Sequence, residues 1–131
     1  MAVKHVSAIF MIKTNDEGMI EMLIGGKEFE MDVFEAGTAE KLENGLKKVQ
    51  AACAPAQEAQ NASDIIRAQC AAVFELFDSL FGEGTSKDVF GEKVSLTAAL
   101  DAFDALIAEI NRQKAEMTAR TEKYAKVNAS V

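Results

Sequence analysis

The spacing of apolar residues changes along this 131-residue chain, and that change constrains the fold more than any other feature. Between Glu28 and Val33 apolar and acidic residues alternate, which is typical of a half-buried β-strand with an acidic outer face. From Thr38 onward apolar residues recur at every third or fourth position, as they do on one face of an α-helix. The sequence therefore predicts an α+β fold, in which a small N-terminal antiparallel β-hairpin or meander precedes about three α-helices.

Residues 1–36 supply the predicted meander of a single domain that spans residues 1–131. The stretch "VSAIFMIK" is apolar on both alternating faces and predicts a first strand, and the polar "TNDEG" that follows predicts a turn. After "MIEMLI", the pair Gly25-Gly26 indicates a two-residue hairpin connection. In the last strand, Phe29, Met31 and Val33 are expected on one face.

Residues 38–126 make up the predicted helical part. Thr38 is the expected N-cap of the first helix, and Pro55 should end that helix near Ala54. Asn61 or Ser63 could cap the second helix, whose apolar stripe is the most hydrophobic and is expected at the centre of the core. That stripe comprises Ile66, Cys70, Val73, Phe74, Phe77 and Phe81.

The third helix is predicted to be long and to end in an exposed arm. Its stripe of Leu and Ile residues thins after Ile110, and the segment "NRQKAEMTARTEKYAK" that follows is strongly charged. Asn111 to Val131 carries five basic and two acidic residues, whereas Thr14 to Gly45 carries nine acidic and two basic ones. Such an asymmetry suits head-to-tail contact with an oppositely charged partner, although a solvated surface explains it as well.

The connection "FGEGTSKDVFGEKVSL", Phe81 to Leu96, contains glycines, hydroxyls and a lysine, the ingredients of a phosphate-binding loop. A P-loop needs two glycines separated by four residues, the second followed directly by Lys, whereas here Gly82 and Gly84 lie two positions apart. The preceding element is also a helix rather than a strand. The connection is therefore predicted to be structural and to bind no cofactor.

Several residues of this connection have an expected structural role. Gly82 should terminate the second helix, and Thr85 with Asp88 resembles a capping box for a short helical turn. Phe90 is expected to turn into the core, and Ser95 to cap the long helix.

No combination of residues predicts catalysis, and the chain is not expected to be an enzyme. His5 is the single histidine and has no identifiable nucleophile or carboxylate partner, and three Cys and His residues in all are too few for a zinc site. Cys53 and Cys70 are expected to be buried free thiols, with a disulfide as the alternative. The carboxylate pairs Asp101/Asp104 and Glu75/Asp78 are expected to be solvated.

Charge and hydropathy also bear on partners and location. A net charge of −7 argues against a nucleic-acid surface, because phosphate contacts need clustered Lys and Arg. No apolar run has the length of about 18–20 residues that a membrane span needs. We therefore expect a cytoplasmic protein that contacts neither nucleic acid nor membrane.

Two segments carry a family resemblance. "MLIGGKEFEMDVFEAGTAEKLENGLKKV", Met22 to Val49, and "FELFDSLFGEGTSKDVFGEKVSL…ALDAFDALIAEINRQK", Phe74 to Lys114, resemble the tail assembly chaperones of long-tailed, siphovirus-like phages and prophages of Gram-positive bacteria. Those proteins open with a hairpin that ends in an acidic Asp-x-Phe-(Asp/Glu)-Ala segment, and the FGEGTS-type connection is the most specific shared element. Residues 1–21 precede the resemblance, so we expect either that Met22 is an alternative start or that the extension is genuine.

The resemblance implies a non-enzymatic chaperone in the cytoplasm of the infected host. Such a chaperone binds the phage tape measure protein and keeps it soluble during tail assembly, and the major tail protein is a further candidate partner. Self-association into a homo-oligomer is expected, because a domain this small leaves apolar surface uncovered. The alternatives are a structural component or adaptor retained in the phage particle, and a small regulator directed at a host protein.

Five side chains are predicted to contact either the client or a second copy of the chain. Three belong to the hairpin and two to the C-terminal arm, and all are large apolar or aromatic residues in amphipathic segments. They are Phe29, Met31, Phe34, Met117 and Tyr124.

Overall fold

The computed structural model describes residues 10–24, 27–54 and 61–130. Within them a three-stranded antiparallel sheet of order β1-β2-β3 precedes the helices, which confirms the predicted α+β class. The predictions for His5, the Gly25-Gly26 turn and the start of the first strand lie outside the described residues. The elements are β1 (Phe10–Thr14), β2 (Ile20–Ile24), β3 (Lys27–Met31), α2 (Ala36–Ala52), α3 (Ala62–Phe81), α4 (Thr85–Phe90) and α5 (Leu96–Ser130).

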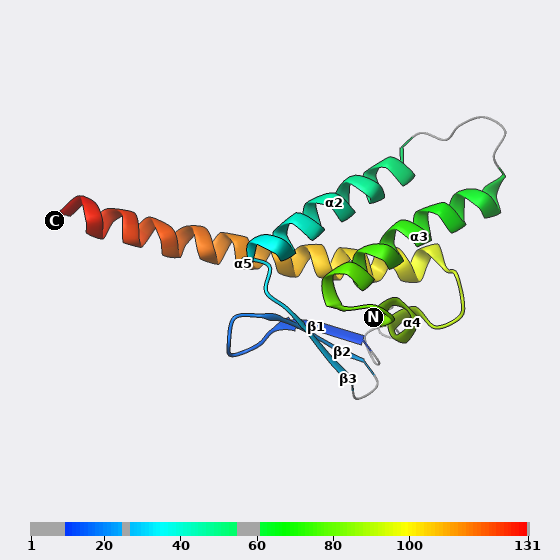
Figure 1. Cartoon of the computed structure of the whole chain (residues 1–131), viewed down its shortest axis with the longest axis horizontal. Helices are drawn as coiled ribbons and strands as arrows, with labels where there is room; N and C mark the ends of the chain where they lie inside the picture. The colour runs from blue at the N-terminus through cyan, green and yellow to red at the C-terminus, as the bar shows by residue number, and fades with distance from the viewer. Residues whose placement is uncertain (1–9, 25–26, 55–60, 131) are drawn as a thin grey trace.

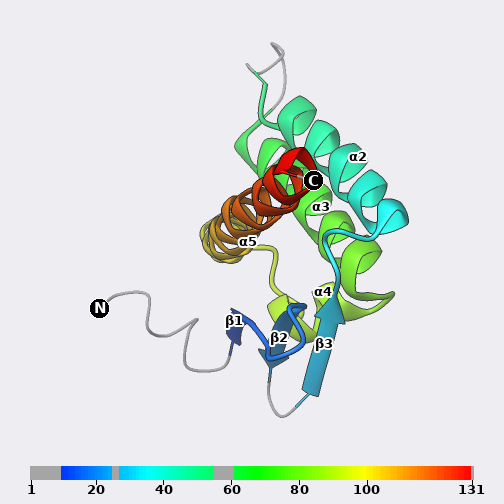
Figure 2. The same ribbon diagram turned by 90° about the vertical axis from the view of Figure 1, so that its left-hand side faces the viewer.

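The helices lie on one side of the sheet, and α5 extends well beyond all other described elements (Figures 1 and 2). α2 and α3 form an antiparallel helical hairpin, and α3 also packs against α5, α4 and β3, while β1 packs against α5. α3 is therefore the central helix, as its hydrophobic stripe predicts.

The strand register sorts the sheet into two faces. Ile12, Met22 and Phe29 lie opposite one another across the strands on the face that packs against the helices, and Met22 is completely buried. The next rung, Lys13, Glu21 and Glu30, points to the other face because successive side chains alternate. The predicted acidic outer face of β3 is confirmed by this register.

The turn "TNDEG" between β1 and β2 is held by an asparagine. Asn15 Oδ1 accepts hydrogen bonds from the backbone N–H groups of Glu17 and Met19, each at 3.0 Å. Gly18 has φ +83°, a left-handed conformation that a side chain would strain. The turn therefore has one defined shape, which matters below because it contacts α5.

The core is built chiefly by α3 and by one side of α5. In α3 the buried stripe is rotated slightly from the predicted one, so that Leu76 and Leu80 are buried while Phe74 and Phe81 are only partly covered. Phe90 of α4 does turn inward as expected: its ring stacks on Phe74 at 4.7 Å and meets Phe77 edge-on at 5.5 Å. Aromatic packing thus fixes α4 against α3.

Asp78 of α3 holds the start of α4, which is a role that the sequence did not indicate. Its carboxylate accepts from the backbone N–H of Ser86 at 2.7 Å and from the Ser86 hydroxyl at 3.0 Å. The predicted Thr85–Asp88 capping box is wrong, because Thr85 is already inside α4 and its hydroxyl donates to the Gly82 carbonyl instead. The FGEGTS connection is therefore ordered by a long-range cap.

Other predicted helix ends can be compared directly. Thr38 is not the N-cap of α2, because the helix begins at Ala36 and Thr38 already lies inside it. Glu35 is the N-cap, and its carboxylate accepts a hydrogen bond from the Thr38 N–H at 2.8 Å. Asn61 caps α3 and Ser95 Oγ accepts from the Ala98 N–H, as predicted. Gly82 follows α3 with φ +119°, which fits a glycine at that position.

The cysteine prediction is half right. Both cysteines are free, but Cys53 is exposed because α2 ends at Ala52 and leaves it in the following turn. Cys70 is buried in α3, and burial raises the pKa of its thiol. Cys70 is thus a core side chain with suppressed thiolate character.

The contact between α2 and α3 requires a glycine at position 45. A Cβ placed on Gly45 would lie 2.4 Å from Leu76 Cδ1, and Leu76 is 1% exposed and unable to move into solvent. The two helix backbones approach closely at this point only because Gly45 has no side chain.

We predict that Gly45→Val lowers the free energy of unfolding by about 2 kcal/mol, because the added side chain overpacks the α2–α3 contact. Urea unfolding followed by circular dichroism measures the loss. Ala51→Val, an exposed position of the same helix, is the matched control and should change stability by less than about 0.5 kcal/mol. Equal midpoints for the two variants would contradict the close contact.

We also predict that Asp78→Ala destabilises the fold by about 1 kcal/mol through loss of the α4 cap. Asp101→Ala removes a carboxylate from an exposed position of α5 and serves as the control. Hydrogen exchange should localise the effect to residues 85–90. Unchanged protection there in the Asp78 variant would show that the carboxylate does not order the connection.

Candidate functional site

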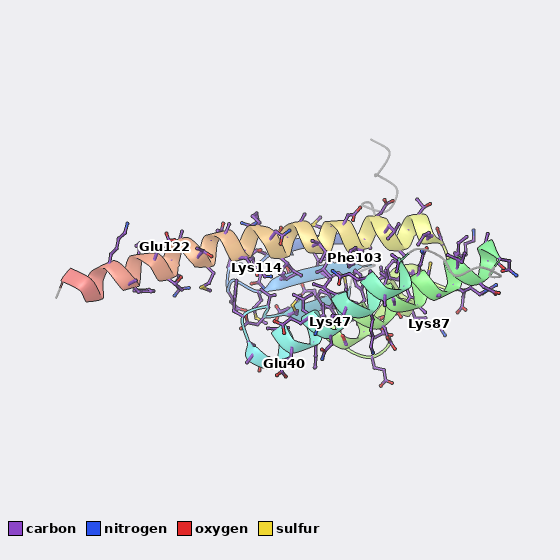
Figure 3. The ribbon with its side chains drawn as sticks, turned by 90° about the horizontal axis from the view of Figure 1, so that it is seen from above. Glu40, Lys47, Lys87, Phe103, Lys114 and Glu122 are labelled. Atoms are coloured by element: carbon purple, nitrogen blue, oxygen red, sulfur yellow. The ribbon has the colours of Figure 1, made fainter. Side chains whose placement is uncertain are left out.

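The buried side of α5 stops at Gln113, and this point is the root of the exposed arm. Leu106 and Ile110 are almost completely buried, and Gln113 is 4% exposed. Beyond it, Met117 is half-buried and residues 118–126 are exposed. Figures 1 and 3 show the arm, which carries Glu122, projecting past the sheet and the other helices.

A polar network joins the β1–β2 turn to α5 at this root. Gln113 Nε2 donates to Thr14 Oγ1 and to the Gly18 carbonyl, each at 2.9 Å. Thr14 Oγ1 donates in turn to Glu109 Oε2 and accepts from Arg112 Nη2. These contacts join residues about one hundred positions apart in the chain, and they fix the direction in which the arm leaves the body.

Glu109 is the charged centre of the network. Arg112 donates to Glu109 Oε2 at 2.7 Å, and this hydrogen bond lowers the pKa of the Glu109 carboxyl; partial burial opposes the shift, and the Thr14 hydroxyl adds to it. The same contact raises the pKa of the Arg112 guanidinium, which also donates to Glu116 at 2.7 Å. The ionised carboxylate is therefore the form that the folded state prefers.

We predict that Glu109→Gln lowers stability by about 1 kcal/mol at pH 7, a value reduced for the solvent exposure of Arg112. Because the folded-state pKa of Glu109 is depressed, its contribution is complete above its unfolded pKa, about 4.3, and is lost as pH falls through the folded value. The difference in unfolding free energy between wild type and variant should therefore disappear in acid. Glu122→Gln, on the exposed arm, is the control. A difference in unfolding free energy that persists in acid would show that the ionised Glu109 carboxylate is not its cause.

An open groove lies beside the network, with a volume of about 320 Å³. The β1–β2 turn, the segment after β3 and the root of the arm each contribute to its walls. Its lining residues are Thr14, Glu17, Gly18, Asp32, Phe34, Gln113, Glu116, Met117 and Arg120. Apolar side chains thus lie in the groove beside three carboxylates and one guanidinium.

Gln113 gives the groove an unusual polar feature. Its Nε2 is fully engaged with Thr14 and Gly18, whereas its Oε1 is buried and accepts no hydrogen bond from the described residues. A buried acceptor without a donor costs free energy, and such a group is often satisfied by a ligand or partner. Because this oxygen is closed off from the surface, it marks a local cost of packing at the root of the arm and not a contact point within the groove.

The structure brings together only some of the five predicted contact residues. Phe34, which is 40% exposed, and Met117 line the same groove although they come from distant parts of the chain. Tyr124 lies two helical turns farther along the arm on the side of Met117 and is 57% exposed. Met31 is 3% exposed, and Phe29 is partly buried against the core, so these two residues present less surface to a partner than Phe34 does.

Sequence reasoning missed Gln113, Thr14 and the acidic residues of the groove. One signal was present: Gln113 continues the stripe of Leu106 and Ile110 at helical spacing, so a polar residue stands at a position that faces the core. The partner of that residue, a turn at the opposite end of the sequence, could not be inferred from spacing.

In residues 10–24, 27–54 and 61–130, no cluster of His, Cys, Asp and Glu side chains is arranged to hold a metal ion. Over the same described part of the chain, no helix combines the length and apolarity needed to cross a bilayer. The groove at the arm root, where Phe34 and Met117 lie beside Gln113, is the candidate site.

The fold and groove define a small α+β protein with a projecting helical arm. The chain belongs to the family of unknown function DUF6673, whose sequence pattern matches residues 25–130. No curated protein and no solved structure shows a significant match to it. The family match covers both the groove wall at Phe34 and the arm with Met117 and Tyr124.

Proposed function

We propose that the chain is a non-enzymatic tail assembly chaperone of a long-tailed phage or prophage, and that it binds the tape measure protein in the cytoplasm of the bacterial host. The client assignment rests on the resemblance of Met22–Val49 and Phe74–Lys114 to that family. The major tail protein is a second possible partner, and we expect the chaperone to self-associate. Nucleic acid and membranes are not among the proposed partners.

One structural observation supports a polypeptide client: the apolar side chains of the groove continue onto the arm. Phe34 and Met117 line the groove, and Tyr124 extends the same side of α5. A chaperone that holds an amphipathic helix needs a strip of exposed apolar groups at helical spacing, with charge around it for solubility. The net charge of −7 meets the second need.

The role found for the FGEGTS connection is compatible with this proposal. Asp78 and the ring of Phe90 hold it against α3, and its Ser86 hydroxyl and N–H are engaged by the Asp78 carboxylate. The most specific element of the resemblance thus has a structural explanation that needs no bound phosphate.

Co-expression with the tape measure protein tests the proposal. We expect the soluble fraction of the client to rise when the chain is present, because a bound client helix no longer exposes its apolar face. Phe34→Ser should reduce the gain, whereas Val94→Ser, at a position that is equally 40% exposed but far from the groove lining, should not. A client equally soluble without the chain would refute the chaperone role.

The alternative of a structural subunit or adaptor predicts a different fate for the protein. A chaperone should leave before the particle is complete, so mass spectrometry of purified virions should not detect it. Detection at a fixed ratio to the major tail protein would favour the structural alternative.

A further inference from the structure

We propose that the β1–β2 turn, Asn15 to Met19, is a lid on the groove: it opens from α5 while the body stays folded, and the hydroxyl of Thr14 is the group that holds it closed. In the closed form Thr14, Glu17 and Gly18 supply one wall of the groove, and the root of the arm supplies another. Opening removes the first wall. The opening is a property of the chain alone, whereas its effect on a client rests on the proposed chaperone function.

The Thr14 hydroxyl uses its whole capacity for hydrogen bonds when the lid is closed. A hydroxyl can donate one hydrogen bond and accept two. This one donates to Glu109 Oε2, and it accepts from Arg112 Nη2 at 2.6 Å and from Gln113 Nε2 at 2.9 Å. All three partners belong to α5, so one hydroxyl at the end of β1 ties the start of the lid to three side chains of the long helix.

The lid itself has little apolar surface with which to stay closed. Asp16, Glu17 and Gly18 are exposed, and Met19 is only partly covered. The Gly18 carbonyl accepts from Gln113 Nε2 at 2.9 Å, which adds one hydrogen bond to α5. Surface segments held by a few polar contacts open at a lower free-energy cost than buried core elements. The lid therefore has the features of a unit that opens separately.

The lid can move without losing its own shape. Asn15 Oδ1 accepts from the N–H groups of Glu17 and Met19, each at 3.0 Å, and Asn15 Nδ2 donates to Glu30 of β3 at 3.1 Å. These contacts lie within the turn and the sheet, so they survive when the lid leaves α5. The open form thus keeps a folded hairpin.

Gln113 makes the closed form less favourable than its two hydrogen bonds alone would make it. Its Nε2 donates to Thr14 and Gly18, but its Oε1 is buried and accepts nothing from the described residues. The cost of an unsatisfied buried acceptor is similar in size to the net gain from one or two hydrogen bonds. When the lid opens, water reaches the amide and this cost is recovered. The bonds of Thr14 to Glu109 and Arg112 therefore decide whether the lid stays closed.

Hydrogen exchange of the Gln113 side-chain amide, followed by NMR, tests the lid directly. These protons are hydrogen-bonded in the closed form and meet water when the lid opens. We expect them to be less protected than the backbone N–H groups of Val73 and Leu76, which lie in the buried part of α3. Low concentrations of urea should leave their exchange rate unchanged, because local opening exposes little new surface. Equal protection of the Gln113 and α3 protons, with the same urea dependence, would overturn the proposal.

Thr14→Val and Thr14→Ser separate the hydroxyl from the rest of the side chain. Val keeps the branched shape without the hydroxyl, so exchange of the Gln113 amide should become about tenfold faster. Ser keeps the hydroxyl, and its exchange rate should stay within about threefold of wild type. Circular dichroism verifies that both variants fold. Equal exchange rates in the two variants would show that the Thr14 hydroxyl does not hold the lid.

Thr97 provides the matched control for these substitutions. It is exposed on α5 and lies more than four helical turns before Gln113, away from the groove lining. Thr97→Val and Thr97→Ser change the same atoms and should leave exchange of the Gln113 amide unchanged. An equal acceleration in Thr97→Val and Thr14→Val would assign the effect to general destabilisation and contradict the lid.

Co-expression with the tape measure protein tests the link between lid and client. Thr14→Val should reduce the gain in client solubility, because the groove loses one wall when the lid is open, and Thr14→Ser should retain the gain. A full gain with Thr14→Val, in a variant whose Gln113 amide exchanges faster, would show that binding does not need the closed lid. A wild-type chain that gives no gain would refute the chaperone role, and the exchange experiments, which contain no client, would still decide whether the lid opens.

Discussion

Burial of the apolar side of α3 is the constraint on which the rest of the fold depends. This helix packs against α2, α4, α5 and β3, and its residues Val73, Leu76 and Phe77 are almost inaccessible to solvent. The neighbouring elements adapt to it in different ways: α2 approaches closely through Gly45, and α4 is held by the carboxylate of Asp78. Apolar burial sets the arrangement, and a few polar contacts select its details.

The same principle explains where the body ends and the arm begins. α5 is covered as long as β1 and α3 lie beside it, and its last buried residue, Gln113, is bonded to the β1–β2 turn. Past that point the helix continues without cover from the described elements (Figure 1). A helix of this kind gains little from its own propensity, so an uncovered stripe such as Met117 and Tyr124 suggests that another polypeptide completes it.

Sequence patterns predicted the fold class, the central helix and the exposed arm, because hydrophobic periodicity directly reports which side of an element is buried. They failed where a side chain acts over a long sequence distance. Asp78 capped a helix that begins seven residues later. The cap of α2 was misplaced for a different reason, because the helix already begins at Ala36, before Thr38. The groove was also invisible, since Phe34, Gln113 and the β1–β2 turn meet only in the folded chain. Of the five predicted contact residues, Met31 was placed on the correct apolar face of its strand, but alternation alone does not show that the helices cover this face and leave Met31 only 3% exposed.

The central claim is that the surface formed by Phe34, Met117 and Tyr124 binds another polypeptide, which we propose is a helix of the client. Methionine-methyl NMR on the full chain tests it most directly, because Met117 lies in the groove and Met11, 50% exposed on β1, lies outside it. We predict that the Met117 signal shifts when an unlabelled segment of the tape measure protein is added, while the Met11 signal stays fixed. A Met117 signal that does not move, or a shift confined to Met11, would contradict it.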